Sequence, residues 1–217
     1  MRNRNIILFT TLSISLLVLF VLDLIIGSVY ISLKDVWGTL IGSEVDKTTR
    51  LIVFDIRLMK AIVAVVAGVA LSVSGLQMQT LFRNPLAGPY VLGISSGASL
   101  GVAIFIHGMP ILGITNNGII SSIGTAGAAW IGSALILVFI ASVSTRIKDI
   151  MVILILGMMF SSGVSAVVQI LQYMSNEEAL KSFVIWTMGS LGDVTSNQLK
   201  LLLPAVVLGL ILSVLVI

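Results

Sequence analysis

Serines, a single histidine and a single acid stand out as side chains that could carry chemistry inside the apolar segments of this 217-residue sequence. Gly93, Ser95 and Gly97 match the G-x-S-x-G pattern of a hydrolase nucleophile elbow. That elbow needs a strand followed by a helix, with a separate acid and histidine, whereas these residues begin an apolar segment that also holds the only histidine, His107. We therefore expect no enzymatic site and interpret His107 as an interfacial residue at a helix end.

A polar stripe runs through another apolar segment, residues 150–173. Its members recur every four positions, about one helical turn, and are Gly157, Ser161, Ser165 and Gln169. Polar side chains are costly in lipid, so the stripe should face the bundle interior or a water-filled path. Interhelical hydrogen bonding and the lining of a translocation pathway both fit this pattern, and pathway lining is our hypothesis.

Several other kinds of chemistry find no support in the sequence. One histidine and no cysteine give no metal cluster, disulfide framework or thiolate site, so we expect no metal and no cofactor. No phosphate-binding G-x-x-x-x-G-K-[ST] sequence occurs, so any ATP hydrolysis would need another subunit. The basic residues are scattered without interleaved aromatics, which argues against nucleic acid. Asp23 could join a proton relay, but relays usually pair several ionisable groups.

The elements that position these side chains are predicted to be membrane-spanning helices. Hydrophobic residues make up 58% and charged residues 10% of the chain, against roughly 25% charged in a soluble domain. No Asp, Glu, Lys or Arg occurs from Asn84 to Thr145, a run long enough for two crossings of about 20 residues each. Lipid offers the backbone no hydrogen-bond partner, and continuous apolar runs without alternation favour helices over a barrel.

We predict an all-α polytopic transmembrane helical bundle that forms a single domain over residues 1–217. The six expected crossings are Ile6–Gly27, Leu58–Leu81, Tyr90–His107, Gly118–Ser144, Ile150–Tyr173 and Leu199–Ile217, with a turn at 108–118. The first lacks a clear cleavage site and should be retained as an anchor. The last reaches Ile217 without a polar flank, so we expect a C-terminally truncated portion of a longer chain.

Small residues at four-residue spacing predict close packing of three of these helices. The sets are Gly93, Gly97 and Gly101; Gly124, Ala128 and Gly132; and Ala64, Gly68 and Ser72 with Gly75 nearby. Small faces let helix backbones approach each other, which is how membrane helices associate. A sliding or rotating interface is the functional alternative.

A helix break is predicted between the second and third crossings, at residues 83–89. Pro85 and Pro89 stop helices, Gly88 permits unusual backbone angles, and the residue before each proline is biased towards extended structure.

Residues 55–101 resemble the FecCD-like permeases, the membrane subunits of bacterial type II ABC importers for iron–siderophore complexes, haem and cobalamin. The residues that carry the resemblance are Arg57, Gly68, Leu71, Ser74, Gly75, Gln79, Arg83, Asn84, Pro85, Leu86, Ala87, Pro89, Leu92, Gly93, Ile94, Ser95, Gly97 and Ala98. Trp186 to Ser190 and Pro204 also match, so the resemblance covers nearly the whole chain.

The resemblance implies a permease subunit of an ATP-driven importer in the cell inner membrane, with its N-terminus in the cytoplasm. It implies about ten crossings in the full subunit, of which this chain holds the first six. Its partners would be a second permease copy in a homodimer, ABC ATPase subunits and a periplasmic substrate-binding protein. The fifth helix would help to line the pathway, and the substrate would be an iron–siderophore chelate, or haem or cobalamin.

The chain departs from the family at the start of the second crossing, where the pattern has two arginines separated by two residues. Arg57 is present, but Lys60 replaces the second arginine and loses its bidentate fork. By the resemblance both would dock acidic groups of the binding protein, whereas anchoring of a helix end is the alternative role. A truncated, non-transporting membrane remnant and a secondary carrier are the alternative functions of the chain.

Overall fold

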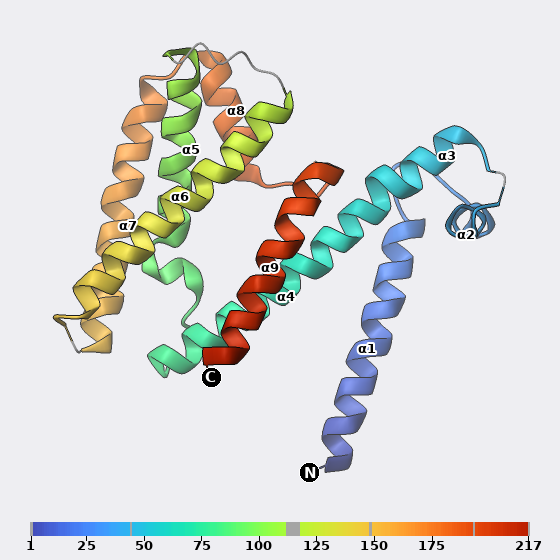
Figure 1. Cartoon of the computed structure of the whole chain (residues 1–217), viewed down its shortest axis with the longest axis horizontal. Helices are drawn as coiled ribbons and strands as arrows, with labels where there is room; N and C mark the ends of the chain where they lie inside the picture. The colour runs from blue at the N-terminus through green and yellow to red at the C-terminus, as the bar shows by residue number, and fades with distance from the viewer. Residues whose placement is uncertain (1, 44, 112–117, 148, 193, 217) are drawn as a thin grey trace. The chain divides into compact units, whose positions relative to one another are not determined.

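A computed structural model describes residues 2–43, 45–111, 118–147, 149–192 and 194–216 of the chain (Figure 1). Every regular element within these ranges is helical. The elements are α1 (Arg2–Ile25), α2 (Leu33–Ile41), α3 (Lys47–Leu51), the π-helical segment η1 (Ile52–Leu58), α4 (Met59–Phe82), the 3₁₀ turn η2 (Pro89–Leu92), α5 (Ile94–Ile111), α6 (Gly118–Ser144), α7 (Ile150–Tyr173), α8 (Glu177–Met188) and α9 (Ser196–Val216).

Five helical segments of the described chain are long and apolar enough to cross a membrane. They are Asn3–Ile25, Lys47–Phe82, Ile123–Ser144, Ile150–Tyr173 and Ser196–Leu215. The expected third crossing corresponds to α5, whose apolar part, Ile94–Met109, is shorter than these. Its predicted limits were wrong at both ends, because Tyr90 lies in η2 and Gly108 lies inside α5 instead of in a turn. The rest of that turn, residues 112–117, lies outside the described residues.

Short helices between the crossings were missed by the sequence analysis. The structure places α2, α3 and η1 between α1 and α4, and α8 between α7 and α9. The start of α2 carries a local signal: the Ser32 side chain accepts a hydrogen bond from the backbone N–H of Asp35 and donates one to its carboxylate. Gly42 ends the helix with φ 84°, a left-handed conformation that favours glycine. An N-cap pattern of this kind is readable in a sequence.

The described helices group into two units by their contacts, and the single domain predicted over residues 1–217 remains a prediction. One unit comprises residues 1–70 and 190–217, and the other comprises residues 71–189. The apolar core of the first unit joins α1, α2 and the α3–α4 segment through Leu24, Ile31, Val36, Val53 and Ala61.

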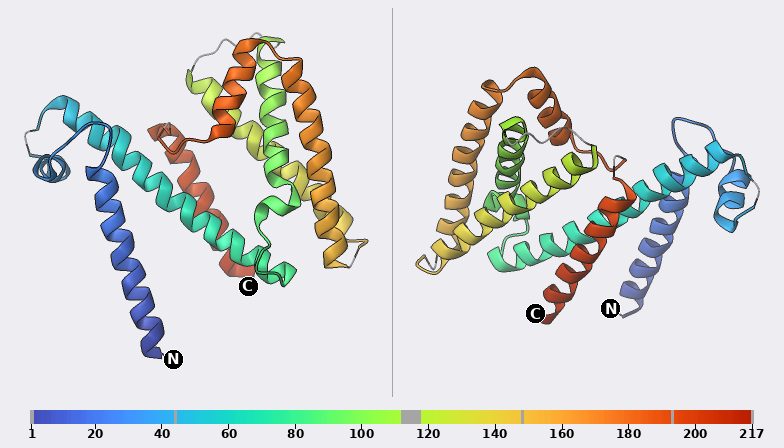
Figure 2. Two further views of the ribbon diagram at one scale, coloured as in Figure 1. Left: turned by 180° about the vertical axis from the view of Figure 1, so that it is seen from behind. Right: turned by 45° about the horizontal axis from the view of Figure 1, so that its top comes forward.

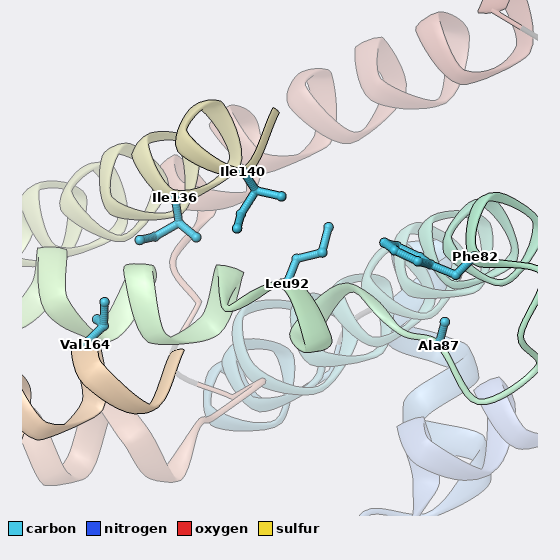
Figure 3. Packing of buried hydrophobic residues seen from close by; sticks show 6 residues of the cluster. All are labelled: Phe82, Ala87, Leu92, Ile136, Ile140 and Val164. Atoms are coloured by element: carbon cyan, nitrogen blue, oxygen red, sulfur yellow. The ribbon is translucent and has the colours of Figure 1, made fainter. Parts of the chain in front are cut away.

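The second unit is built around α5, which packs against α6, α7 and α8 (Figure 2). Its first core cluster consists of Phe82, Ala87, Leu92, Ile136, Ile140 and Val164. Figure 3 shows Leu92 of η2 with Ile136 and Ile140 of α6 close by. A second cluster, in which Phe183 of α8 meets Val102, Ala103 and Val168, holds α8 against α5 and α7. Residues of the helix break therefore form part of the core of this unit.

Glycines form the contact between α5 and α6. A Cβ atom at Gly97 would lie 2.6 Å from the carbonyl oxygen of Gly132, and one at Gly101 would overlap the carbonyl of Ala128. Gly124 meets the ring of Phe105 in the same way. Because real Cβ atoms do not approach backbone this closely, the close approach of the two helix backbones depends on the absence of side chains at Gly97 and Gly101. By contrast, a Cβ at Gly68 or Gly75 of α4 would meet nothing within 4 Å.

We predict that Gly101→Ala destabilises the protein by about 2 kcal/mol, because the added methyl group forces α5 away from the Ala128 backbone. The matched control is Gly127→Ala on α6, where a Cβ meets nothing within 4 Å and the better helix propensity of alanine should leave stability equal or slightly higher. The free energy of unfolding can be measured by detergent titration in mixed micelles. Equal stability of the two variants would contradict the close backbone contact.

Candidate functional site

Local hydrogen bonds hold the segment between α4 and α5 in place. Arg83 follows α4 with φ 47°, the only positive φ at a non-glycine residue in the described chain. This left-handed turn lets the backbone N–H of Asn84 donate to the carbonyl of Gln79 at 3.1 Å, which satisfies one of the last carbonyls of α4. The Asn84 side chain then accepts from the N–H of Leu86, and the Asn84 carbonyl accepts from Ala87. The side chains of Gln79 and Arg83 are exposed.

Gly88 and Gly93 shape the second half of the break for different reasons. Gly88 has φ −137° and ψ 166°, an extended conformation open to any residue, so it does not use the unusual backbone angles that a glycine permits. What Gly88 provides is space, since a Cβ would lie 2.6 Å from the ring of Tyr90. Pro89 opens η2, and Gly93 closes it with φ 79°. Gly93 therefore precedes α5 and does not share the helical face of Gly97 and Gly101.

The first three residues of the predicted polar stripe, Gly157, Ser161 and Ser165, face α5 and η2. Gly157 is buried, and a Cβ there would lie 3.1 Å from the Val91 carbonyl oxygen. The Ser161 hydroxyl lies 2.5 Å from that of Ser96 on α5, and the Ser165 hydroxyl lies 3.5 Å from the same oxygen. These serines therefore form an interhelical hydrogen-bond cluster within the unit.

The C-terminal end of the stripe is different, because Gln169 is exposed. Ser162, which the sequence analysis did not single out, is exposed as well and lies seven residues away, about two turns along the same face of α7. The other exposed face of α7 is apolar and borders an open groove. This groove is lined by Leu100, Leu156, Met159, Phe160, Gly163, Val164 and Val167.

His107 joins α5 to the end of α7. Its Nε2 lies 2.7 Å from the carbonyl oxygen of Leu171 and 2.6 Å from the hydroxyl of Ser175, while Nδ1 lies 3.0 Å from the Ala103 carbonyl. Leu171 belongs to the last turn of α7, whose carbonyls lack helical partners. Ser95 lies twelve residues before His107 on the same helix, about 18 Å along its axis, so the two cannot act as nucleophile and base.

Arg57 closes the C-terminal end of α1. The π-helical segment η1 turns Val53 and Arg57 towards α1, and both are buried, with Arg57 only 6% exposed. The Arg57 guanidinium donates hydrogen bonds to the carbonyls of Leu24 at 2.8 Å and Ile25 at 2.7 Å, and a third to the carbonyl of Val29. A Cβ at Gly27 would lie 2.7 Å from the guanidinium, so this glycine leaves room for it.

Lys60 lies near Arg57 in sequence but is half exposed. Its Nζ forms an ion pair with the Asp23 carboxylate of α1 at 2.9 Å, and the Lys60 side chain is 46% exposed. Asp23, which the sequence analysis considered for a proton relay, is therefore paired with the ammonium of Lys60 near the C-terminal end of α1. Of the two basic residues predicted to dock a partner, only Lys60 presents its charge at the surface.

Comparisons with known proteins identify relatives along nearly the whole chain. A profile of the FecCD transport family matches residues 15–217. The Haemophilus influenzae molybdate import system permease protein MolB is 34% identical over 88% of this chain and 55% of its own length. The Yersinia pestis hemin transport system permease protein HmuU is 35% identical over 85% and 54%. The chain thus spans about half the length of these curated relatives.

The fold also matches a solved structure of a metal-chelate type ABC transporter in an inward-facing conformation. The TM-score is 0.74 at 27% sequence identity, over 93% of this chain and 59% of the other. The predicted all-α transmembrane bundle is confirmed by this match.

We predict that Arg57→Met costs at least about 2 kcal/mol of unfolding free energy, because the carbonyls that end α1 lose their donor inside the protein. Arg57→Lys keeps the charge without the planar fork and should fall between wild type and Arg57→Met. Lys60→Met is the matched control, since it removes an exposed ion pair worth at most about 1 kcal/mol. Detergent titration followed by circular dichroism measures all three, and a larger loss for Lys60→Met would contradict the assignment of Arg57 as the structural cation.

Proposed function

The chain belongs to the FecCD transport family, and we propose that it forms the first part of the permease subunit of an ATP-driven importer. It is a multi-pass protein of the cytoplasmic membrane. The observation that carries the proposal is the ordered set of motif residues from Arg57 to Ala98, which lies within the family match over residues 15–217. We propose a role in forming the translocation path and no covalent chemistry.

The proposed substrate is an iron–siderophore chelate, with haem and cobalamin as further candidates. The names of the relatives support a metal-containing or oxyanion cargo, since one imports molybdate and another transports hemin. The family likeness includes a metal-chelate type transporter. Selection among these cargoes would rest with the binding protein.

The proposed partners follow from what the sequence lacks and from the family. The 217 residues hold no phosphate-binding loop, and by the family the energy of ATP hydrolysis would come from separate ATPase subunits. A second permease copy would complete a homodimeric path, and a periplasmic binding protein would deliver the cargo. This assembly requires the N-terminus of α1 to be cytoplasmic.

We propose that the binding protein docks on Lys60. Arg57 would not contact the binding protein but would hold the end of α1 in place beneath Lys60. Exposure supports this division, because Lys60 is 46% exposed and Arg57 is 6% exposed with its donors on three carbonyls. Arg57 holds the end of α1, and with it the Asp23 carboxylate that orients Lys60. An acidic group of the partner would then meet the ammonium of Lys60 at the membrane edge.

We predict that Lys60→Glu weakens binding of the periplasmic binding protein about tenfold or more, because an attractive charge becomes repulsive. Affinity is measured on the full-length permease in nanodiscs by interferometry at low and high salt, and the difference should shrink at high salt. Arg4→Glu is the matched control, since Arg4 lies at the opposite end of α1. Unchanged affinity for Lys60→Glu would reject docking at this residue.

The pathway is proposed to be lined by the exposed polar face of α7, which Ser162 and Gln169 mark, together with the edge of Ser165. Ser161 and Gly157 of the predicted stripe support this face from behind, because their contacts with Ser96 and Val91 hold α7 in place. This division supports testing the pathway at Gln169, where a bulky residue does not disturb the serine cluster.

We predict that Gln169→Trp lowers uptake of a ferric siderophore at least about tenfold in proteoliposomes containing the full-length permease, its ATPase and its binding protein, because the indole would obstruct the path. Met159→Trp, on the apolar exposed face of α7, is the control and should leave uptake unchanged. Wild-type uptake should require ATP. Uptake that survives without ATP would support a secondary carrier, and equal uptake by both variants would remove this face of α7 from the path.

A further inference from the structure

Helix α2 lies beside the last turn of α1, at the level where α1 leaves a membrane. Val36 of α2 is buried against Leu24 of α1 and Val53 of η1. Helix α1 has 24 residues, which corresponds to about 36 Å, slightly more than a hydrocarbon core of about 30 Å. The end of α1, and α2 with it, therefore falls in the interfacial region.

The axis of α2 crosses that of α1. Figure 1 views α2 almost end-on while α1 lies lengthwise, and the left view of Figure 2 shows the same difference of direction from behind. If α1 spans the bilayer, α2 runs along its surface. A helix in this orientation has one flank towards the lipid and the opposite flank towards water.

One flank of α2 is apolar and the other is polar, as expected for a helix that lies along a membrane surface. At 3.6 residues per turn, Leu33, Trp37 and Ile41 form a stripe on one flank of the buried Val36 and Thr39 side. Asp35 lies on the other flank, about 160° round the helix from Leu33 and Trp37, and is exposed. Lys34 is exposed as well and lies next to the stripe, about 20° round the helix from Ile41.

No other described residue covers the apolar stripe. Leu33 is 63%, Trp37 is 62% and Ile41 is 66% exposed. Tyr30, just before the N-cap of α2, is exposed as well. Three large apolar residues on one face cost free energy in water, and an exposed tryptophan at the end of a spanning helix is typical of the membrane interface.

We propose that α2 is an interfacial helix whose Leu33, Trp37 and Ile41 insert into the headgroup and upper acyl region of the bilayer. The inserted helix fixes the depth of α1 and of the Asp23–Lys60 pair at the membrane edge, because it packs on Leu24, next to Asp23 in sequence. Lys34 borders the stripe, and its long stem allows the ammonium to reach the lipid phosphates.

A lipid surface explains the stripe better than a protein partner does. The stripe continues the apolar surface of α1, whose residues from Asn3 to Leu22, apart from the partly buried Phe20, are exposed for contact with lipid, and Ile26 just beyond the helix is exposed too. The polar flank of α2 remains available to water or to a soluble protein. A partner on the apolar flank would have to enter the bilayer itself.

Depth-dependent fluorescence quenching tests the proposal on the whole chain. The tryptophans are Trp37, Trp130 and Trp186, so Trp130→Phe with Trp186→Phe leaves Trp37 as the only indole. The protein is reconstituted into phosphatidylcholine and phosphatidylglycerol vesicles that carry a nitroxide either near the headgroup or near the acyl methyl end. Quenching of Trp37 by the shallow label should exceed quenching by the deep label at least about twofold, with little quenching by iodide.

The matched control keeps Trp130, which lies in the middle of α6, through Trp37→Phe with Trp186→Phe; the deep label should quench this variant more strongly. Strong iodide quenching of Trp37 without lipid quenching would overturn the proposal in favour of an aqueous surface. Protection of Trp37 from all three quenchers would overturn it in favour of a protein cover.

Cysteine labelling gives a second readout that needs no change at the tryptophans, because the chain has no cysteine. In vesicles, Leu33→Cys should react with a water-soluble maleimide at least about tenfold more slowly than Asp35→Cys, since Asp35 lies about 160° round the helix from Leu33, on the water-facing flank. In detergent-free denaturant the two should react at similar rates. Equal rates in vesicles would contradict insertion of the stripe.

Discussion

A backbone group that leaves a helix inside a membrane finds no water, and the protein must supply its partner. Three groups of polar contacts in the described chain meet this requirement at helix ends. Arg57 donates to the carbonyls that end α1, His107 lies against the Leu171 carbonyl at the end of α7, and the turn at Arg83 and Asn84 closes α4. Within the described residues, no buried side-chain nitrogen or oxygen lacks a hydrogen-bond partner.

This constraint divides the polar side chains between structure and function. A buried cation such as Arg57 cannot serve a partner protein without releasing three carbonyls, whereas Lys60 can exchange an exposed carboxylate at little cost. The same division separates Ser161, bound to Ser96, from the exposed Gln169. The exposed members of each pair are therefore the ones proposed to meet a binding protein and a transported chelate.

The sequence predicted the helical class, the family and the limits of α6 and α7 correctly, because long apolar runs and an ordered motif are local signals. The sequence did not predict the backbone angles of the helix break or the short helices. Gly88 permits a positive φ, yet within the break the positive φ values occur at Arg83 and Gly93, because the hydrogen bonds of the turn decide where the backbone reverses. Helices α2 and α8 were missed because short helices depend on packing through Val36 and Phe183.

By itself the sequence determined that this is a membrane protein and which family it belongs to, since composition and motif order do not depend on where side chains point. Only the tertiary structure decided what each polar residue does. Spacing places Arg57 beside Lys60 and Ser161 beside Ser165, but their burial and partners come from α1 and α5, segments distant in the chain. Roles that depend on such neighbours become visible only when the helices have packed.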